Sequence, residues 1–197
     1  MFKQRSHDTH HDTHIPQIEN NQGQYTIVLL GDSLFERFKT TGENLSINKN
    51  EQILNLGVGG DRVQNVQYRI DRGLLKSMKE HQQNIKLIYV HMGSNNLKKN
   101  GLRKEDAESY DTLIKELRTE YPNIPIIITA MFIQRELDAD IIEEGNIALR
   151  KIADTYRCEF LPFGTDQAGI MSEDNVHLNE FGYTKWNTIL ENDMKCR

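Results

Sequence analysis

Short apolar runs alternate with amphipathic segments from residue 25 to the end of the chain. Continuous apolar runs of this kind are typical of strands that are buried on both faces of a parallel sheet. They predict five strands: Tyr25–Leu30, Ile53–Leu56, Ile85–Met92, Ile124–Ala130 and Cys158–Leu161.

Between these runs, apolar side chains recur at the spacing of one helix face. The predicted helices cover Ser33 to about Lys39, Val63–Leu74 with Asp61 as its N-cap, Ala107–Leu117, Ile141–Tyr156 and Phe181–Met194. Strands that alternate with helices predict a parallel sheet covered on both faces by right-handed crossovers. We therefore expect one α/β domain over residues 25–197, a three-layer α/β/α sandwich around a five-stranded parallel sheet.

Three polar, glycine-containing loops follow three of the predicted strands. They begin at Gly31, at Gly57–Gly60 and at Gly93. Because ligands bind beyond the carboxyl ends of parallel strands, these loops are expected to meet at one edge of the sheet and to form one site.

Residues 1–24 lack this pattern and are rich in His, Asp, Asn and Gln. Such a composition predicts a disordered tail, since it offers little apolar surface to bury. Alternating His and Asp could hold a metal ion, but a solvated tail is the favoured interpretation. We accordingly expect the removal of residues 1–22 to leave the turnover number nearly unchanged.

The composition excludes some classes of function. A net charge of −5 over 197 residues does not favour nucleic-acid binding, and no apolar stretch approaches the length of a membrane span. The N-terminus lacks the apolar region of a secretory signal, so a cytoplasmic location is the default expectation. Cys158 and Cys196 are not expected to form a disulfide, and the oligomeric state stays open, a homodimer included.

Three residues could form a nucleophilic site. Ser33 follows the first strand, where a serine hydroxyl needs a neighbouring base, and His177 with Asp174 three residues before it could supply one. Taken singly, Ser33 reads better as a helix N-cap and His177 as a surface histidine. The combination, however, contains the parts of a Ser-His-Asp hydrolase.

Two of the loops offer groups that could stabilise an oxyanion. A backbone N–H of the loop with Gly57, Gly59 and Gly60 could do so, as could the side-chain amide of Asn95. The alternatives are a tight strand-to-helix turn for the glycines and a turn residue for Asn95.

In this order, the four segments resemble the conserved blocks of the SGNH (GDSL-type) hydrolases. The segments are Gly31-Asp32-Ser33-Leu34, Gly59-Gly60-Asp61, Gly93-Ser94-Asn95-Asn96 and Asp174-Asn175-Val176-His177. The residues of these segments are similar to those of the catalytic subunits of intracellular platelet-activating-factor acetylhydrolase. Asn96 departs from the Asp of many members, although the acetylhydrolase-like branch shares it.

The resemblance implies a flavodoxin-like fold, ester or thioester hydrolysis, and neither metal nor cofactor. It assigns the nucleophile to Ser33, the rest of the triad to Asp174 and His177, and the oxyanion hole to Ser33, Gly60 and Asn95. We expect a carboxylic ester hydrolase that acts on short acyl esters, acetyl esters among them, of a lipid or a carbohydrate. A lipid or thioester hydrolase of the same fold, or a catalytically idle binding subunit, remains the alternative.

Overall fold

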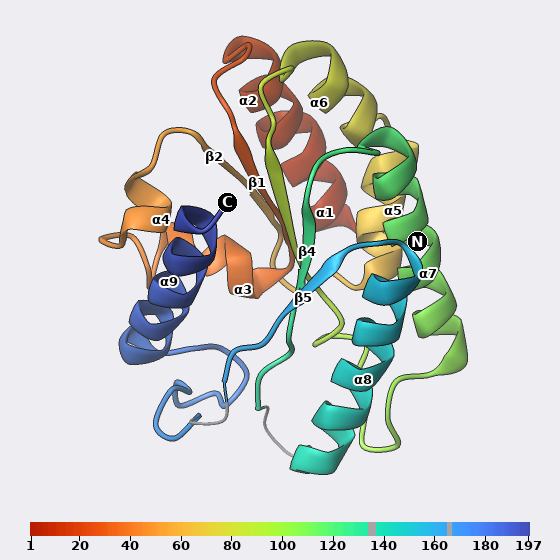
Figure 1. Cartoon of the computed structure of the whole chain (residues 1–197), viewed down its shortest axis with the longest axis vertical. Coiled ribbons are helices and arrows are strands. Elements are labelled where there is room, and N and C mark those ends of the chain that lie inside the picture. Colours follow the sequence, from red (N-terminus) through yellow and green to blue (C-terminus); the bar gives the residue numbers. More distant parts are fainter. Residues whose placement is uncertain (134–136, 165–166) are drawn as a thin grey trace.

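Five parallel strands form the centre of the molecule (Figure 1). The structure is a computed structural model, and it describes residues 1–133, 137–164 and 167–197. The strands lie in the order β2-β1-β3-β4-β5. Their bounds are β1 Ile27–Gly31, β2 Ile53–Gly57, β3 Leu87–His91, β4 Ile126–Thr129 and β5 Glu159–Leu161.

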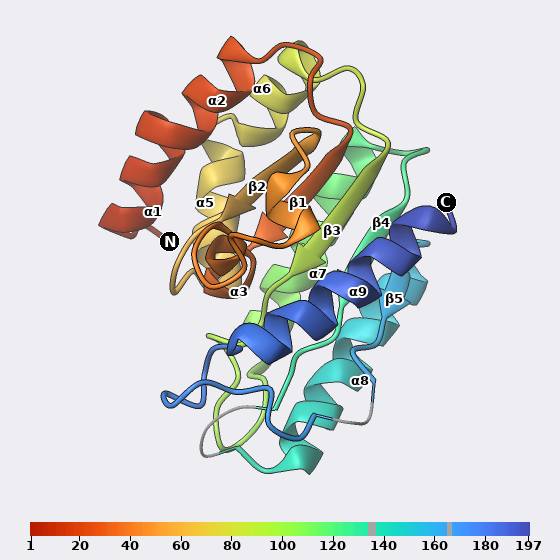
Figure 2. The ribbon, with the colours of Figure 1, turned by 90° about the vertical axis from the view of Figure 1, so that its left-hand side faces the viewer.

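Helices cover both faces of this sheet (Figure 2). One face carries α3 Ser33–Glu36, α4 Ser46–Lys49 and α9 Glu180–Lys195, and the other carries α5 Val63–Asp71, α6 Leu74–His81, α7 Lys104–Glu120 and α8 Ala139–Thr155. Alternate strand residues feed two cores: Leu29 and Tyr89 belong to one, and Leu30 and Val90 to the other. The expected three-layer fold is confirmed, and the strand order is the flavodoxin-like one.

The strand register brings the polar loops to a common edge. Gly31, the last residue of β1, lies beside Gly57 at the end of β2 and beside His91 at the end of β3. The loops that follow these residues therefore start at the same level of the sheet. The element that was expected to run from Val63 to Leu74 is interrupted at Gly73, whose φ of 96° separates α5 from α6.

The prediction of a disordered N-terminal tail is wrong for most of its length. Helix α1 (Gln4–Asp8), a π-helical turn (Thr9–His14) and α2 (Ile15–Asn20) follow one another without a break, and they pack against α5 and α6 (Figure 2). The buried side chains of this segment are Ser6, His10, His14 and Ile18. Their four-residue spacing places them on one helix face.

Buried histidine is compatible with this packing because imidazole can be neutral. Burial lowers the pKa of His10 to about 4, and burial together with the charge of Arg69 lowers that of His14. Gln82 fixes the C-terminal end of the segment, because its Nε2 donates to the carbonyl oxygen of Ile18 at 2.7 Å. Its Oε1 accepts the backbone N–H of Tyr25 at 3.1 Å.

The described ranges of the chain contain neither a membrane-spanning helix nor a metal-binding cluster. Among these residues, no helix combines the length and the apolar character needed to cross a membrane. Within the same part of the chain, no group of three or more His, Cys, Asp or Glu side chains is arranged to hold a metal ion, the histidines of the N-terminal segment included.

Candidate active site

The sharp turn after β1 presents Ser33. Asp32 is the N-cap of α3, and its Oδ1 accepts the N–H of Leu34 at 2.9 Å. Ser33 is therefore not needed as a cap, and its hydroxyl is free for another partner. Gly31 allows the turn to approach β3 closely, because a Cβ at this position would lie 2.5 Å from the carbonyl oxygen of His91.

That partner is His177, which lies 144 residues further along the chain. The Nε2 atom of His177 is 2.9 Å from the Oγ of Ser33, and its Nδ1 is 2.7 Å from the Oδ2 of Asp174. The three side chains form one continuous chain of hydrogen bonds. The His177 ring is partly shielded, with 17% of its side chain exposed, whereas Asp174 is 42% exposed.

Asp174 organises the loop that carries His177. Its Oδ1 accepts the N–H groups of Val176 and His177 at 2.9 Å each and the hydroxyl of Ser172 at 2.8 Å. Burial opposes ionisation, but these bonds and the one from the His177 ring together hold the pKa of Asp174 well below its usual range. Asp174 is consequently a carboxylate at neutral pH and an acceptor for the Nδ1–H of His177.

Asn179 attaches the same loop to the last helix. Its Oδ1 caps α9 by accepting the N–H of Gly182 at 2.9 Å. Its Nδ2 donates to the carbonyl oxygens of Gly169 and Met171 at 2.8 and 3.0 Å. The position of His177 relative to Ser33 therefore depends on the docking of α9.

The glycine loop after β2 forms a tight turn beside this site. The N–H of Asp61 donates to the carbonyl oxygen of Val58 at 3.1 Å, and Gly60 has a φ of 71°. A positive φ at the third residue of such a turn favours glycine. Within the described residues, the N–H of Gly60 donates to no protein acceptor.

Asn95 connects this turn to the nucleophile turn. Its Nδ2 donates to the carbonyl oxygen of Asp61 at 2.9 Å and lies 3.4 Å from the Oδ2 of Asp32. One amide thus contacts the sequence neighbours of both Gly60 and Ser33. The structure therefore gathers the loops of all five predicted site residues around one point at the edge of the sheet.

Asn96 has a structural role that differs from the role expected of Asn95. It is buried, and its Oδ1 accepts the N–H of Val63 at 3.1 Å, at the start of α5. Its Nδ2 donates to the Oδ1 of Asp106 at 2.7 Å. An Asp at this position could not donate to Asp106, so Asn is the residue that this chain requires here.

Sequence reasoning overlooked two buried acids beside the site. Burial raises the pKa of Asp32 to about 7, with Leu34 N–H opposing and Asp61 reinforcing the shift. Burial also raises the pKa of Asp61, against the charge of Arg69 and the hydrogen bond from Ser6. The prediction that Asp61 caps α5 is wrong, since Arg62 occupies the cap position. Instead, the Oδ2 of Asp61 lies 3.2 Å from the Nη2 of the buried Arg69.

Four phenylalanine side chains of this half of the molecule pack largely in the core. Phe35 stacks on Trp186 with ring centroids 4.9 Å apart, and Phe38 and Phe132 also contact this indole. Phe35, Phe38, Phe132 and Phe163 are buried, while Ile133 is partly exposed.

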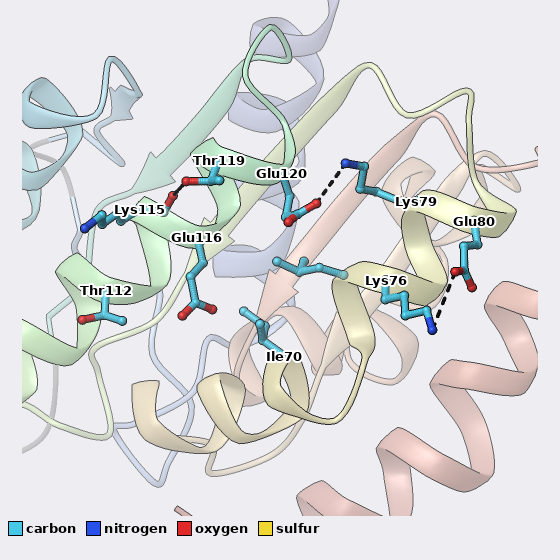
Figure 3. A pocket seen from close by; sticks show the side chains of 10 residues that line it. Ile70, Lys76, Lys79, Glu80, Thr112, Lys115, Glu116, Thr119 and Glu120 are labelled. Atoms are coloured by element: carbon cyan, nitrogen blue, oxygen red, sulfur yellow. Dashed lines mark hydrogen bonds and ion pairs between the residues drawn. The ribbon is translucent and has the colours of Figure 1, made fainter.

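A large surface groove lies elsewhere (Figure 3). It has a volume of about 700 Å³ and runs between α6 and α7, where Lys79 Nζ pairs with Glu120 at 2.9 Å. None of the five predicted site residues lines it. Its size therefore says nothing about the chemistry at Ser33.

The order and the content of the four loops agree with a known family. Residues 29–185 match the GDSL-like Lipase/Acylhydrolase family. The chain belongs to this family.

Similar proteins include other members of this type. A platelet-activating factor acetylhydrolase IB subunit beta homolog of Drosophila melanogaster is 24% identical over 64% of this chain and 52% of its own length. This GDSL-like hydrolase thus spans about half the length of the curated relative that it matches.

Two solved structures share the fold. A Streptococcus pneumonia protein, provisionally named a platelet activating factor, has a TM-score of 0.69 at 20% identity and covers 93% of this chain and 92% of its own. The psychrotrophic esterase EstA of Pseudoalteromonas sp., inhibited by monoethylphosphonate, has a TM-score of 0.68 at 18% identity, with coverages of 86% and 96%. At these identities the likeness establishes the fold of the family member described here.

Proposed function

We propose that the protein is a metal-independent serine esterase in which Ser33 is the nucleophile, His177 the general base and Asp174 the residue that orients the imidazole. The observation that carries the proposal is the unbroken hydrogen-bond chain, 2.9 Å from Ser33 to His177 and 2.7 Å from His177 to Asp174. Both distances lie within the range needed for proton transfer between positioned side chains.

The reaction begins when the Ser33 hydroxyl attacks the acyl carbonyl carbon while the Nε2 of His177 takes its proton. The ionised Asp174 accepts the Nδ1–H, which selects the tautomer with a free Nε2 and stabilises the imidazolium. The imidazolium then protonates the departing alcohol. Water, deprotonated by the same Nε2, hydrolyses the acyl-enzyme and releases the acid.

Three donors stabilise the negative charge on the carbonyl oxygen: the backbone N–H groups of Ser33 and Gly60 and the Nδ2 of Asn95. Asn95 has two N–H bonds. One is held by Asp61 at 2.9 Å, and the other faces Asp32 at a longer 3.4 Å, so an oxyanion can compete for it. Donors that are fixed before the reaction need no reorganisation when the charge develops.

Short acyl groups, acetyl among them, are the substrates that we favour. The name of the Drosophila relative contains acetylhydrolase, and the buried phenylalanines fill the core instead of an open channel. The alcohol could be a lipid or a carbohydrate. A lipid or thioester hydrolase is the main alternative; an idle binding subunit is disfavoured because it would have no use for the hydrogen-bonded Ser33.

The test is labelling and turnover with Ser33→Ala. The wild-type protein should hydrolyse nitrophenyl acetate faster than long-chain nitrophenyl esters, and a fluorophosphonate should label Ser33. The variant should lose both properties while its melting temperature stays close to that of the wild type, since only residual catalysis survives the loss of a nucleophile. Unchanged turnover in the purified variant would refute the nucleophile assignment, and preference for long chains would favour the lipid hydrolase.

A further inference from the structure

The N-terminal helical segment lies on the glycine loop of the active site. The Nζ of Lys3 donates to the carbonyl oxygen of Gly59 at 2.6 Å and to the Oδ1 of Asp61 at 3.3 Å. The hydroxyl of Ser6, one helical turn further on, donates to the Oδ2 of Asp61 at 2.9 Å. A segment outside the four motif loops therefore contacts the loop that carries Gly60.

The contact of Lys3 falls on a particular peptide group. The turn closed by Val58 and Asp61 has the Gly59–Gly60 peptide at its centre. Because a trans peptide is planar, its C=O and N–H point in opposite directions. Whatever holds the carbonyl oxygen of Gly59 thus also fixes the direction of the Gly60 N–H.

The side chains of the turn itself do not select the orientation of this peptide. Rotation of the central peptide would convert this turn, which has a positive φ at Gly60, into one in which both central φ values are negative, and glycine accepts both conformations. The two residues here are both glycine, so side chains impose no preference. A charged donor at 2.6 Å from the carbonyl oxygen stabilises one of the two orientations.

We propose that Lys3 is a positioning residue of the oxyanion site: its ammonium group holds the Gly59–Gly60 peptide so that the Gly60 N–H faces the reacting carbonyl. The inference rests on the proposed role of Gly60. A hydrogen bond to the carbonyl also polarises the amide, which makes its N–H a better donor.

The packing around Lys3 supports the assignment. A Cβ at Gly60 would lie 3.1 Å from the Lys3 Nζ, and one at Gly59 would lie 2.6 Å from the Nη1 of Arg5. Arg5 itself pairs with Glu36 of α3 at 2.9 Å. The segment therefore lies directly against the loop at both glycines.

Asp61 links Lys3 to Asn95, the side-chain donor of the proposed oxyanion site. Its carboxyl group binds Lys3, Ser6 and the buried Arg69, and its carbonyl oxygen holds the Nδ2 of Asn95 at 2.9 Å. Residues of the N-terminal segment thus fix both the Gly60 peptide and the residue on which Asn95 rests.

Lys3→Met and Lys3→Gln test the proposal in the full-length protein, with nitrophenyl acetate as substrate. Both variants should lower kcat about 10-fold, somewhat less than the direct loss of an oxyanion donor, while KM changes less than about twofold. Lys3→Arg, which keeps a charged donor, should recover most of kcat. Lys79→Met is the matched control, since it removes a lysine that pairs with Glu120 in the distant groove.

Melting temperatures and fluorophosphonate labelling separate the outcomes. Lys3 is partly exposed, so its variants should unfold within a few degrees of the wild type and of Lys79→Met. Wild-type kcat in both Lys3 variants, with Ser33 still labelled, would overturn the inference and leave the proposed function standing. A fall in kcat that Lys3→Arg does not recover would also overturn it. A wild-type protein that is neither labelled nor active would overturn both proposals.

Discussion

The side chains of Asn95 and Asn96 lie in the loop after β3, and we expect their removal to affect different properties of the protein. Asn95 contacts Asp61 beside the proposed oxyanion site, whereas Asn96 joins the start of α5 to Asp106. The difference lies in what each amide contacts, because the two residues are identical in chemistry. Substitution of each in turn separates catalysis from stability.

Asn95→Ala is expected to lower kcat by roughly 100- to 1000-fold with a much smaller change in KM, because the donor acts on charge that appears in the transition state. Steady-state kinetics with a nitrophenyl ester measures this. A change confined to KM would make Asn95 a substrate-binding residue instead.

Asn96→Ala is the control for that experiment. It leaves the N–H of Val63 without its acceptor and removes one donor from the Asp106 carboxylate, which keeps Arg103 and Gln64, so we expect a loss of about 1–3 kcal/mol in the free energy of unfolding. Its kcat per folded molecule should stay within a few-fold of the wild type. Denaturant unfolding and active-site titration with a fluorophosphonate measure the two quantities separately.

At the scale of elements, the apolar runs located all five strands, because a strand buried on both faces leaves a continuous signal. The strand ends were less accurate. Tyr25 was expected to open β1, which begins at Ile27, because the N–H of Tyr25 bonds to a side chain, that of Gln82. Gly73 similarly ended a helix that the apolar spacing alone would have continued.

The N-terminal helices were missed for a different reason. Composition treats histidine as polar, yet Ser6, His10, His14 and Ile18 recur every four residues and form the buried face. That spacing is readable in the sequence and could have indicated a helix. The role of Lys3 could not be read in this way, because it depends on where α1 docks.

Because His10 is buried in its neutral form, we expect the free energy of unfolding to depend on pH. Burial lowers the pKa of His10 to about 4, whereas an unfolded histidine titrates near 6.5. Acid therefore favours the unfolded state: the contribution of His10 is complete above about pH 6.5 and is lost as the pH falls toward 4.

His10→Gln tests this at the level of the helix. Gln can still donate to the carbonyl oxygen of Arg72, which lies 3.3 Å from the His10 Nε2, but it does not titrate. The melting temperature of the wild type should fall by several degrees between about pH 7 and 5, and that of the variant should fall less, as one pKa unit corresponds to about 1.4 kcal/mol. Equal slopes in the two proteins would show that His10 is not the group responsible.

For the whole molecule, the N-terminal segment is part of the globular domain. Removal of residues 1–22 exposes apolar surface that Ile18 covers, a side chain whose burial is worth about 1.5–3 kcal/mol, and it leaves Gln82 without its acceptors at Ile18 and Asn21. From this packing we expect the opposite of the sequence-based prediction, which was that removal of residues 1–22 leaves the turnover number nearly unchanged.

We expect the truncated protein to melt at least several degrees lower and to lose most of its esterase activity. Scanning calorimetry and a nitrophenyl acetate assay below the new melting temperature measure both effects. Gln4→Ala changes an exposed residue of the same segment and should leave melting within about a degree or two of the wild type. A truncated protein with wild-type kcat would show that the segment is not needed for catalysis.

The separation of 144 residues between Ser33 and His177 has a consequence for biosynthesis. Ser33 leaves the ribosome well before His177, and the helix α9 that anchors the His177 loop emerges after both. On the proposed mechanism, a nascent chain cannot cleave an ester before α9 has been made and has docked. The onset of hydrolysis would therefore report the docking of this helix in each molecule.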